Sequence, residues 1–274
     1  MGKHDIVHGI FQKWTKFLIP AAIALLASVS FLWELSFAEG VTSTPTWMDH
    51  LCNLFSGMKE YNPNSGNPFE VPVLYLAIHV FVAFIIGNYP VNDLYDYAPQ
   101  VLIRTRNRAR WWFEKCIWNV ASVLLFYLIL FGVTFAVNLI AGGVVSLTAS
   151  ADILTEFFGV TQQTVNNGEL ALATFLLPVL TSIALSLVQM VLMLCVKPVY
   201  SYLSIIVLLV SSAYFMTPFL PGNYAMLWRN AVWCEGGIST ALAIVVTITI
   251  AVIAAVVGYF IFQKKDILDK SESN

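Results

Sequence analysis

The chain has 274 residues, of which 58% are hydrophobic and 11% are charged, and its formal net charge is −2. Soluble domains are ~45–50% apolar and ~25% charged, so this chain has too few polar residues to cover a water-soluble globule of its size. The composition excludes an ordinary soluble enzyme and a disordered chain. Without a basic excess, it also argues against nucleic acid as a partner. The chain is therefore predicted to be an all-α, polytopic membrane protein.

Six apolar segments meet the length of a membrane-spanning helix, which is ~20 residues and at least ~17. They lie at residues 17–38, 71–87, 117–141, 170–195, 199–220 and 238–262. The first segment resembles a secretory signal, but its apolar run is longer, which favours an uncleaved span. We detect no internal repeat, so residues 1–274 are interpreted as a single transmembrane domain.

An amphipathic helix is predicted before the first span. Ile6, Ile10, Trp14 and Phe17 share one helical stripe, and the polar residues of segment 4–18 lie largely off it. Such a helix lies in the plane of the membrane interface.

The distribution of positive charge predicts the orientation. Of the 14 Lys and Arg residues, 12 lie on the side of the N-terminus. Lys and Arg concentrate on the cytoplasmic side of membrane proteins, so both termini are predicted to be cytoplasmic, in the cell membrane. The outer loops are then residues 39–70, 142–169 and 221–237, and the last of these is aromatic enough to predict a short helix covering the bundle.

The longest cytoplasmic loop, residues 88–116, carries the main functional candidates. Four arginines precede a Trp pair, which a positive-inside anchor with an aromatic belt would explain. That reading does not explain the acidic and tyrosine-rich run just before them. We therefore expect a short helix presented to a soluble partner, with these candidate contact residues: Asp93, Tyr95, Asp96, Tyr97, Arg104, Arg106, Arg108 and Arg110.

Few other residues suggest chemistry. Glu34 and His79 are the ionisable groups inside predicted spans, and such groups are functional candidates by default. Interfacial water near Glu34 and helix packing around His79 are the simpler interpretations. Cys52 and Cys234 both fall in outer loops and could form a disulfide, although sequence cannot place them within bridging range.

The sequence also lacks the motifs of several catalytic classes. It contains no His-Glu-x-x-His, no Gly-x-Ser-x-Gly, no phosphate-binding Gly-Lys loop and no Cys/His spacing typical of zinc. We therefore expect no enzyme activity, no metal and no cofactor, and a polytopic membrane enzyme is the weakest of the alternatives. A scaffold of uncharged helices with a cytoplasmic docking loop would need a partner protein to supply the energy for its work.

The chain resembles the ABC export permeases of the type-two family, as found in Gram-positive bacteria. Four features carry the resemblance: the amphipathic N-terminal helix; the segment Arg-Thr-Arg-Asn-Arg-Ala-Arg-Trp-Trp-Phe-Glu-Lys at 104–115; the aromatic segment 224–234; and the ending Phe-Gln-Lys-Lys-Asp-Ile-Leu at 262–268. The family's pattern has Ser where this chain has Asn107.

The resemblance implies a specific function. Residues 90–110 would hold a coupling helix that docks on a separate ABC ATPase, and the chain would pair with a second copy or a sister permease. The cargo would be amphipathic, lipid-like or a peptide, because the spans carry almost no charge. The alternative is a small transporter, channel or sensor that works without an ATPase.

Overall fold

The computed structural model describes residues 11–66, 68–87, 89–96, 107–160 and 165–265, and within them the fold is helical with no strand. The main helices are α2 (Leu18–Leu35), α3 (Trp47–Phe55), α4 (Val73–Ile86), α5 (Tyr89–Asp96), α7 (Arg108–Ile140), α8 (Asn167–Ala171), α9 (Leu177–Cys195), α10 (Pro198–Tyr214) and α11 (Thr240–Lys264). Short 3-10 helices are η2 (Phe11–Phe17), η3 (Pro63–Ser65), η6 (Pro221–Ala225) and η7 (Leu227–Arg229). Two π-helical turns are η4 (Ile153–Phe157) and η5 (Leu172–Leu176).

Five helices of the described residues are long and apolar enough to cross a membrane: Trp14–Leu35, Val73–Leu94, Arg108–Ile140, Asn167–Cys195 and Thr240–Lys264. α10 is a sixth apolar helix and has 17 residues. The all-helical prediction is thus confirmed, and the apolar helices are compatible with a membrane protein. The count of six spans and their orientation stay predictions.

The third helix begins earlier than the hydropathy suggested. α7 starts at Arg108, whereas the apolar segment starts at 117. The side chain of Asn107 accepts a hydrogen bond from the Arg110 amide and caps the helix. Trp111 and Trp112 are buried and give these polar first turns a packing surface.

The first half of the predicted N-terminal amphipathic helix, with Ile6 and Ile10, lies outside the described residues, which begin at 11. The described part is the 3-10 helix η2, which runs directly into α2. Its placement at a membrane interface stays a prediction.

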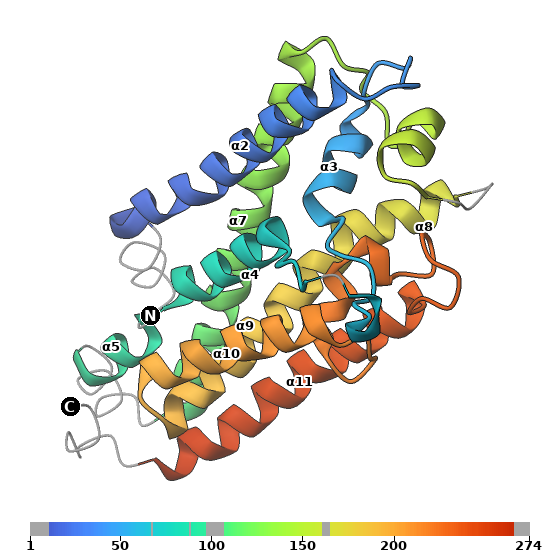
Figure 1. The fold of residues 1–274 in the computed structure, drawn as a ribbon. Coiled ribbons are helices and arrows are strands. Elements are labelled where there is room, and N and C mark those ends of the chain that lie inside the picture. The colour runs from blue at the N-terminus through green and yellow to red at the C-terminus, as the bar shows by residue number, and fades with distance from the viewer. Residues whose placement is uncertain (1–10, 67, 88, 97–106, 161–164, 266–274) are drawn as a thin grey trace.

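α9 is the central helix and packs against α4, α7, α10 and α11 (Figure 1). A π-helical turn, η5, comes just before Pro178 of α9. Proline has no N–H for the carbonyl four residues earlier, so a wider turn at this point accommodates it. α5 and the C-terminal ends of α9 and α11 lie at one end of the bundle, and α3 and α8 lie toward the other.

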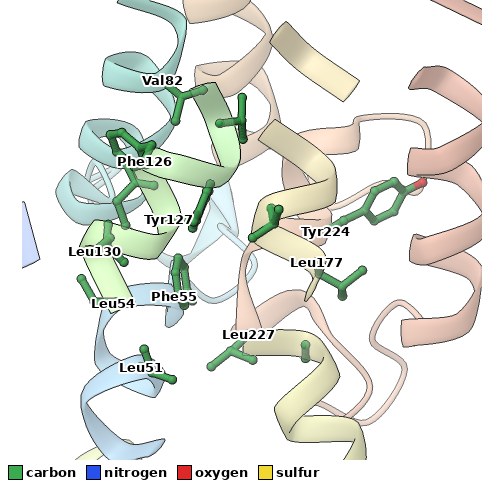
Figure 2. Packing of buried hydrophobic residues seen from close by; sticks show 14 of the residues in the cluster. Leu51, Leu54, Phe55, Val82, Phe126, Tyr127, Leu130, Leu177, Tyr224 and Leu227 are labelled. Atoms are coloured by element: carbon green, nitrogen blue, oxygen red, sulfur yellow. The ribbon is translucent and has the colours of Figure 1, made fainter. Parts of the chain in front are cut away.

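The core includes a helix from the predicted outer loop 39–70. α3 begins with a capping box between Thr46 and Asp49. Its Leu51 and Cys52 are fully buried, and its Phe55 ring lies 6.3 Å from that of Tyr127 on α7. Figure 2 shows Leu51, Phe55 and Tyr127 pointing into the space between the helices. The loop 39–70 therefore contributes a packed helix to the bundle.

The segment 221–237 also folds inward. Its two 3-10 helices are buried, as the aromatic composition of the segment suggested. The Arg229 side chain is fully buried and donates hydrogen bonds to the carbonyl oxygens of Met58, Lys59 and Ala213. This arginine ties the segment to the end of α10 and to the chain that follows α3.

Candidate functional site

The best-organised polar site joins α5 to the start of α7, within the loop that the sequence marked as a docking element. α4 ends at Gly87, whose φ is +43°, and the chain continues as α5. Tyr89 and Leu94 of α5 are buried, so α5 packs against the bundle. We call the contact formed by Tyr89, Asp93, Trp111, Lys115 and Trp118 the α5–α7 junction.

A buried ion pair lies at the centre of the junction. Lys115 Nζ is 2.8 Å from Asp93 Oδ2, and the two side chains are 2% and 3% exposed. Trp111 Nε1 donates a hydrogen bond of 3.1 Å to the same carboxylate oxygen. Removing either charge would take this close opposite charge away from a buried ionised group, which is unfavourable.

Aromatic rings enclose the ammonium group. Lys115 Nζ lies 4.9 Å from the centroid of the Tyr89 ring and 5.5 Å from that of Trp111. Both distances are within the range of a cation–π attraction. Tyr89 packs in turn on Trp118, with ring centroids 4.4 Å apart. The junction therefore joins α5 to two successive turns of α7.

The first turns of α7 also hold the end of α11. Arg108 Nη1 donates to the carbonyl oxygens of Phe262, Gln263 and Lys265 at 3.3, 3.0 and 2.7 Å. These carbonyls belong to the last turn of a helix, where acceptors lack intrahelical partners and a cation is favoured. The Trp111 ring stacks on Phe262 with centroids 4.7 Å apart.

Two further contacts extend the connection. Trp112 Nε1 donates to the Ala255 carbonyl at 2.8 Å, and its ring lies where a Cβ on Gly258 would be. Lys265 Nζ donates to the Leu194 carbonyl of α9 at 2.7 Å. These contacts join α5 through α7 to α11, and Lys265 joins the end of α11 to α9.

The structure places the predicted contact residues in different environments. Asp93 was expected to face a partner, and the structure corrects this expectation, because its side chain is buried in the ion pair. Arg108 was expected in a loop, but it caps α11. Arg110 is exposed and pairs with Glu114 one turn along α7. Tyr95 and Asp96 belong to α5, and Tyr97, Arg104 and Arg106 lie outside the described residues.

A second polar cluster lies inside the bundle, where His79 was singled out. Ser182, Ser186 and Gln189 form one stripe of α9. Ser186 Oγ donates to Asn119 Oδ1 of α7 at 2.6 Å, and Gln189 Nε2 donates to the Ala83 carbonyl of α4 at 3.1 Å. Hydroxyl and amide groups thus join α4, α7 and α9 in the core. We call this set, with His79 and Tyr127, the core polar cluster.

The remaining candidates lie apart from both clusters. Glu34 is exposed in the last turn of α2. Cys52 and Cys234 are both free thiols, so the structure does not contain the predicted disulfide. Cys52 is buried on α3, whereas the Cys234 thiol donates to the carbonyl of its neighbour Glu235. No group of three metal-ligating side chains occurs among the described residues.

Sequence reasoning missed Lys115 and the stripe on α9. Lys115 lies four residues after Trp111 and three before Trp118, so a helical reading places it on the face of both tryptophans. Ser182, Ser186 and Gln189 are spaced i, i+4 and i+7, which marks one face of a helix. Both patterns are visible in the sequence.

Residues 57–268 match a family described as "Protein of unknown function (DUF2705)". The chain belongs to this family. The matched segment runs from the end of α3 to beyond α11 and contains every residue of the α5–α7 junction and of the core polar cluster. No curated protein and no solved structure matches the chain.

Proposed function

We propose that this DUF2705 chain is the membrane-spanning permease subunit of an ABC exporter. It moves an amphipathic, lipid-like or peptide substrate with ATP that a separate subunit hydrolyses. It lies in the cell membrane with both termini in the cytoplasm, and it pairs with a second copy or a sister permease. The chain itself is a transport subunit and not an enzyme.

The observation that carries the proposal is the α5–α7 junction. A partner that hydrolyses ATP can change the permease only if it binds one conformation better than another. That requires an element which moves as a unit and is firmly attached to the spans. α5 fits this requirement, because it leads into the Arg-rich segment and is joined to α7 by the buried Asp93–Lys115 pair. Arg108 and Trp111 then pass any movement to α11.

The core polar cluster supports the proposed class of cargo. Its hydrogen-bonding groups are Ser, Asn, Gln and Tyr side chains and the His79 ring, without a carboxylate or an ammonium group. The core of the bundle thus offers hydrogen bonds without a fixed charge at this cluster. Small ions need charged or densely packed oxygen ligands, so the cluster favours amphipathic molecules over ions.

The test is purification of the chain from its native membrane in mild detergent, followed by mass spectrometry and an ATPase assay. We expect a stoichiometric ATP-binding subunit, which is lost when Arg104, Arg106 and Asp96 are changed to Ala. The control is Lys264→Ala, which removes one exposed positive charge from the end of α11 and should keep the complex. A chain that purifies alone, with no ATP turnover, would overturn the proposal.

One observation favours the second candidate, a transporter, channel or sensor that works without an ATPase. His79 is a buried ionisable side chain inside a candidate span, and such residues often mark a pathway. The same purification separates the two candidates. If the chain is found alone and His79→Leu abolishes transport or signalling while the protein still folds, the second candidate gains.

A further inference from the structure

A small cavity lies between α4, α9 and α10, next to the core polar cluster. Its volume is about 10 Å³, close to the ~10–15 Å³ that the centre of one water molecule needs. It is lined by His79, Val82 and Ala83 of α4, by Ser182, Leu185, Ser186 and Gln189 of α9, and by Ile205 of α10. The question is which hydrogen-bonding groups face it.

The first group is the Nε2 atom of His79. His79 Nδ1 lies 2.8 Å from the Tyr75 carbonyl oxygen, which can only accept, so Nδ1 carries the hydrogen. The neutral ring then has a bare Nε2, which is an acceptor. This atom is buried and has no hydrogen-bond partner among the protein atoms, and His79 as a whole is only 3% exposed.

The second group is the Oε1 atom of Gln189. Donation from Nε2 to the Ala83 carbonyl fixes which way the amide points. Oε1 is therefore the acceptor end, and it too is buried without a protein partner, in a residue 1% exposed. Both residues line the cavity, and each has a buried acceptor atom without a protein partner.

The serines of the cavity cannot supply the missing donors. Tyr127 donates its only hydroxyl hydrogen to the Pro178 carbonyl, so Ser182 is the donor in its 2.8 Å contact with Tyr127. Ser186 donates to Asn119. Both serine hydrogens are used, and an unpaired buried acceptor is costly. The cavity needs a guest that donates two hydrogen bonds.

We propose that this cavity binds one water molecule, which donates one hydrogen to His79 Nε2 and the other to Gln189 Oε1. The water bridges α4 to α9 beside the direct Gln189–Ala83 hydrogen bond. The size of the cavity restricts the guest to a single water, and its two acceptors orient that water. This inference concerns the core polar cluster alone and does not depend on the ATPase partner.

The test uses the full chain in lipid nanodiscs, with histidine rings labelled with ¹⁵N, and measures magnetisation transfer from water to the rings by NMR. The chain has four histidines, so His79→Phe assigns the signal. We expect the Nδ1–H tautomer at His79 and transfer from a bound water to its ring. In Gln189→Met, which keeps the side chain's length without the acceptor, the transfer should fall to background.

Two results would overturn the inference. One is an Nε2–H tautomer at His79 in the unmodified chain, once His79→Phe has assigned its signal. The other is a transfer signal that is absent in the unmodified chain or unchanged in a folded Gln189→Met protein. Neither result would affect copurification with an ATPase, so the two proposals can fail separately.

Discussion

Neutralising Asp93 tests whether the α5–α7 junction is held by its buried charges. In Asp93→Asn the side chain keeps its shape and can still accept the hydrogen bond from Trp111. Lys115, which is 2% exposed and 2.8 Å from the carboxylate, loses this neighbouring negative charge. Removing one member of a buried pair costs ~3–5 kcal/mol, and we expect a loss of this size in the free energy of unfolding.

The chain contains a matched control on the same helix. Arg110 and Glu114 form an ion pair at 2.9 Å, but their side chains are 66% and 18% exposed. A pair one helical turn apart with one largely exposed partner should contribute ~0.2–1 kcal/mol, so Glu114→Gln should change stability by about this amount. The two variants remove the same charge and differ mainly in burial.

The assay is equilibrium unfolding in mixed micelles, followed by tryptophan fluorescence. The double variant Asp93→Asn, Lys115→Met removes both charges and should recover most of the stability lost in Asp93→Asn, since a buried pair can be replaced by apolar groups at little cost. If Asp93→Asn destabilises the protein no more than Glu114→Gln does, the buried pair does not hold the junction and the reasoning is wrong.

Two further predictions concern packing and the thiols. Gly258→Ala should destabilise the bundle by about 1–3 kcal/mol, because the new Cβ would overlap the Trp112 ring. Gly132→Ala on α7 is the control, since a Cβ there meets open space and should be neutral or slightly stabilising. Equal effects of the two substitutions in the same unfolding assay would contradict this reasoning. Under native conditions an alkylating agent should label the exposed Cys195 well before the buried Cys52, and after denaturation without reductant mass spectrometry should find all four cysteines labelled. A protected pair at Cys52 and Cys234 would show that the predicted disulfide forms after all.

The apolar helices were predictable because each is a local pattern. A run of ~20 apolar residues needs no knowledge of its neighbours, and six such runs correspond to α2, α4, α7, α9, α10 and α11. The boundaries were less predictable. Hydropathy marks only the apolar part of a helix, which here begins at residue 117. α7 begins earlier, at Arg108, because the packing of Trp111 and Trp112 and the cap at Asn107 stabilise its polar first turns.

The candidate site was only partly predictable, because it depends on contacts between distant residues. The composition of segment 88–116 marked it as unusual, and that segment does contain most of the junction. Which of its charges are buried depends on where α5 packs, and sequence gave no distance between Asp93 and Lys115. The possible disulfide between Cys52 and Cys234, which the structure does not contain, could not be decided for the same reason, since loop membership says nothing of the distance between two thiols.

The core polar cluster illustrates a different limit. Ser182, Ser186 and Gln189 are common in membrane helices and change the mean hydropathy very little. Their importance comes from Asn119 and His79 on neighbouring helices, and hydropathy treats each helix alone. A search for polar residues spaced i, i+4 and i+7 within apolar segments would have found the stripe, though not its partners.

The unequal lengths of α7 and α10 have a consequence for the surrounding lipid. At 1.5 Å per residue, the 33 residues of α7 extend about 50 Å, whereas the 17 residues of α10 extend only about 26 Å. The hydrocarbon layer of a bilayer is ~30 Å thick. If both helices cross a bilayer, α7 extends well beyond the hydrocarbon layer, whereas α10 is several ångströms shorter than that layer. Hydrophobic mismatch of this kind costs a modest free energy per ångström. The stability of the protein should therefore depend on the acyl-chain length of the lipid, because of the mismatch at α10.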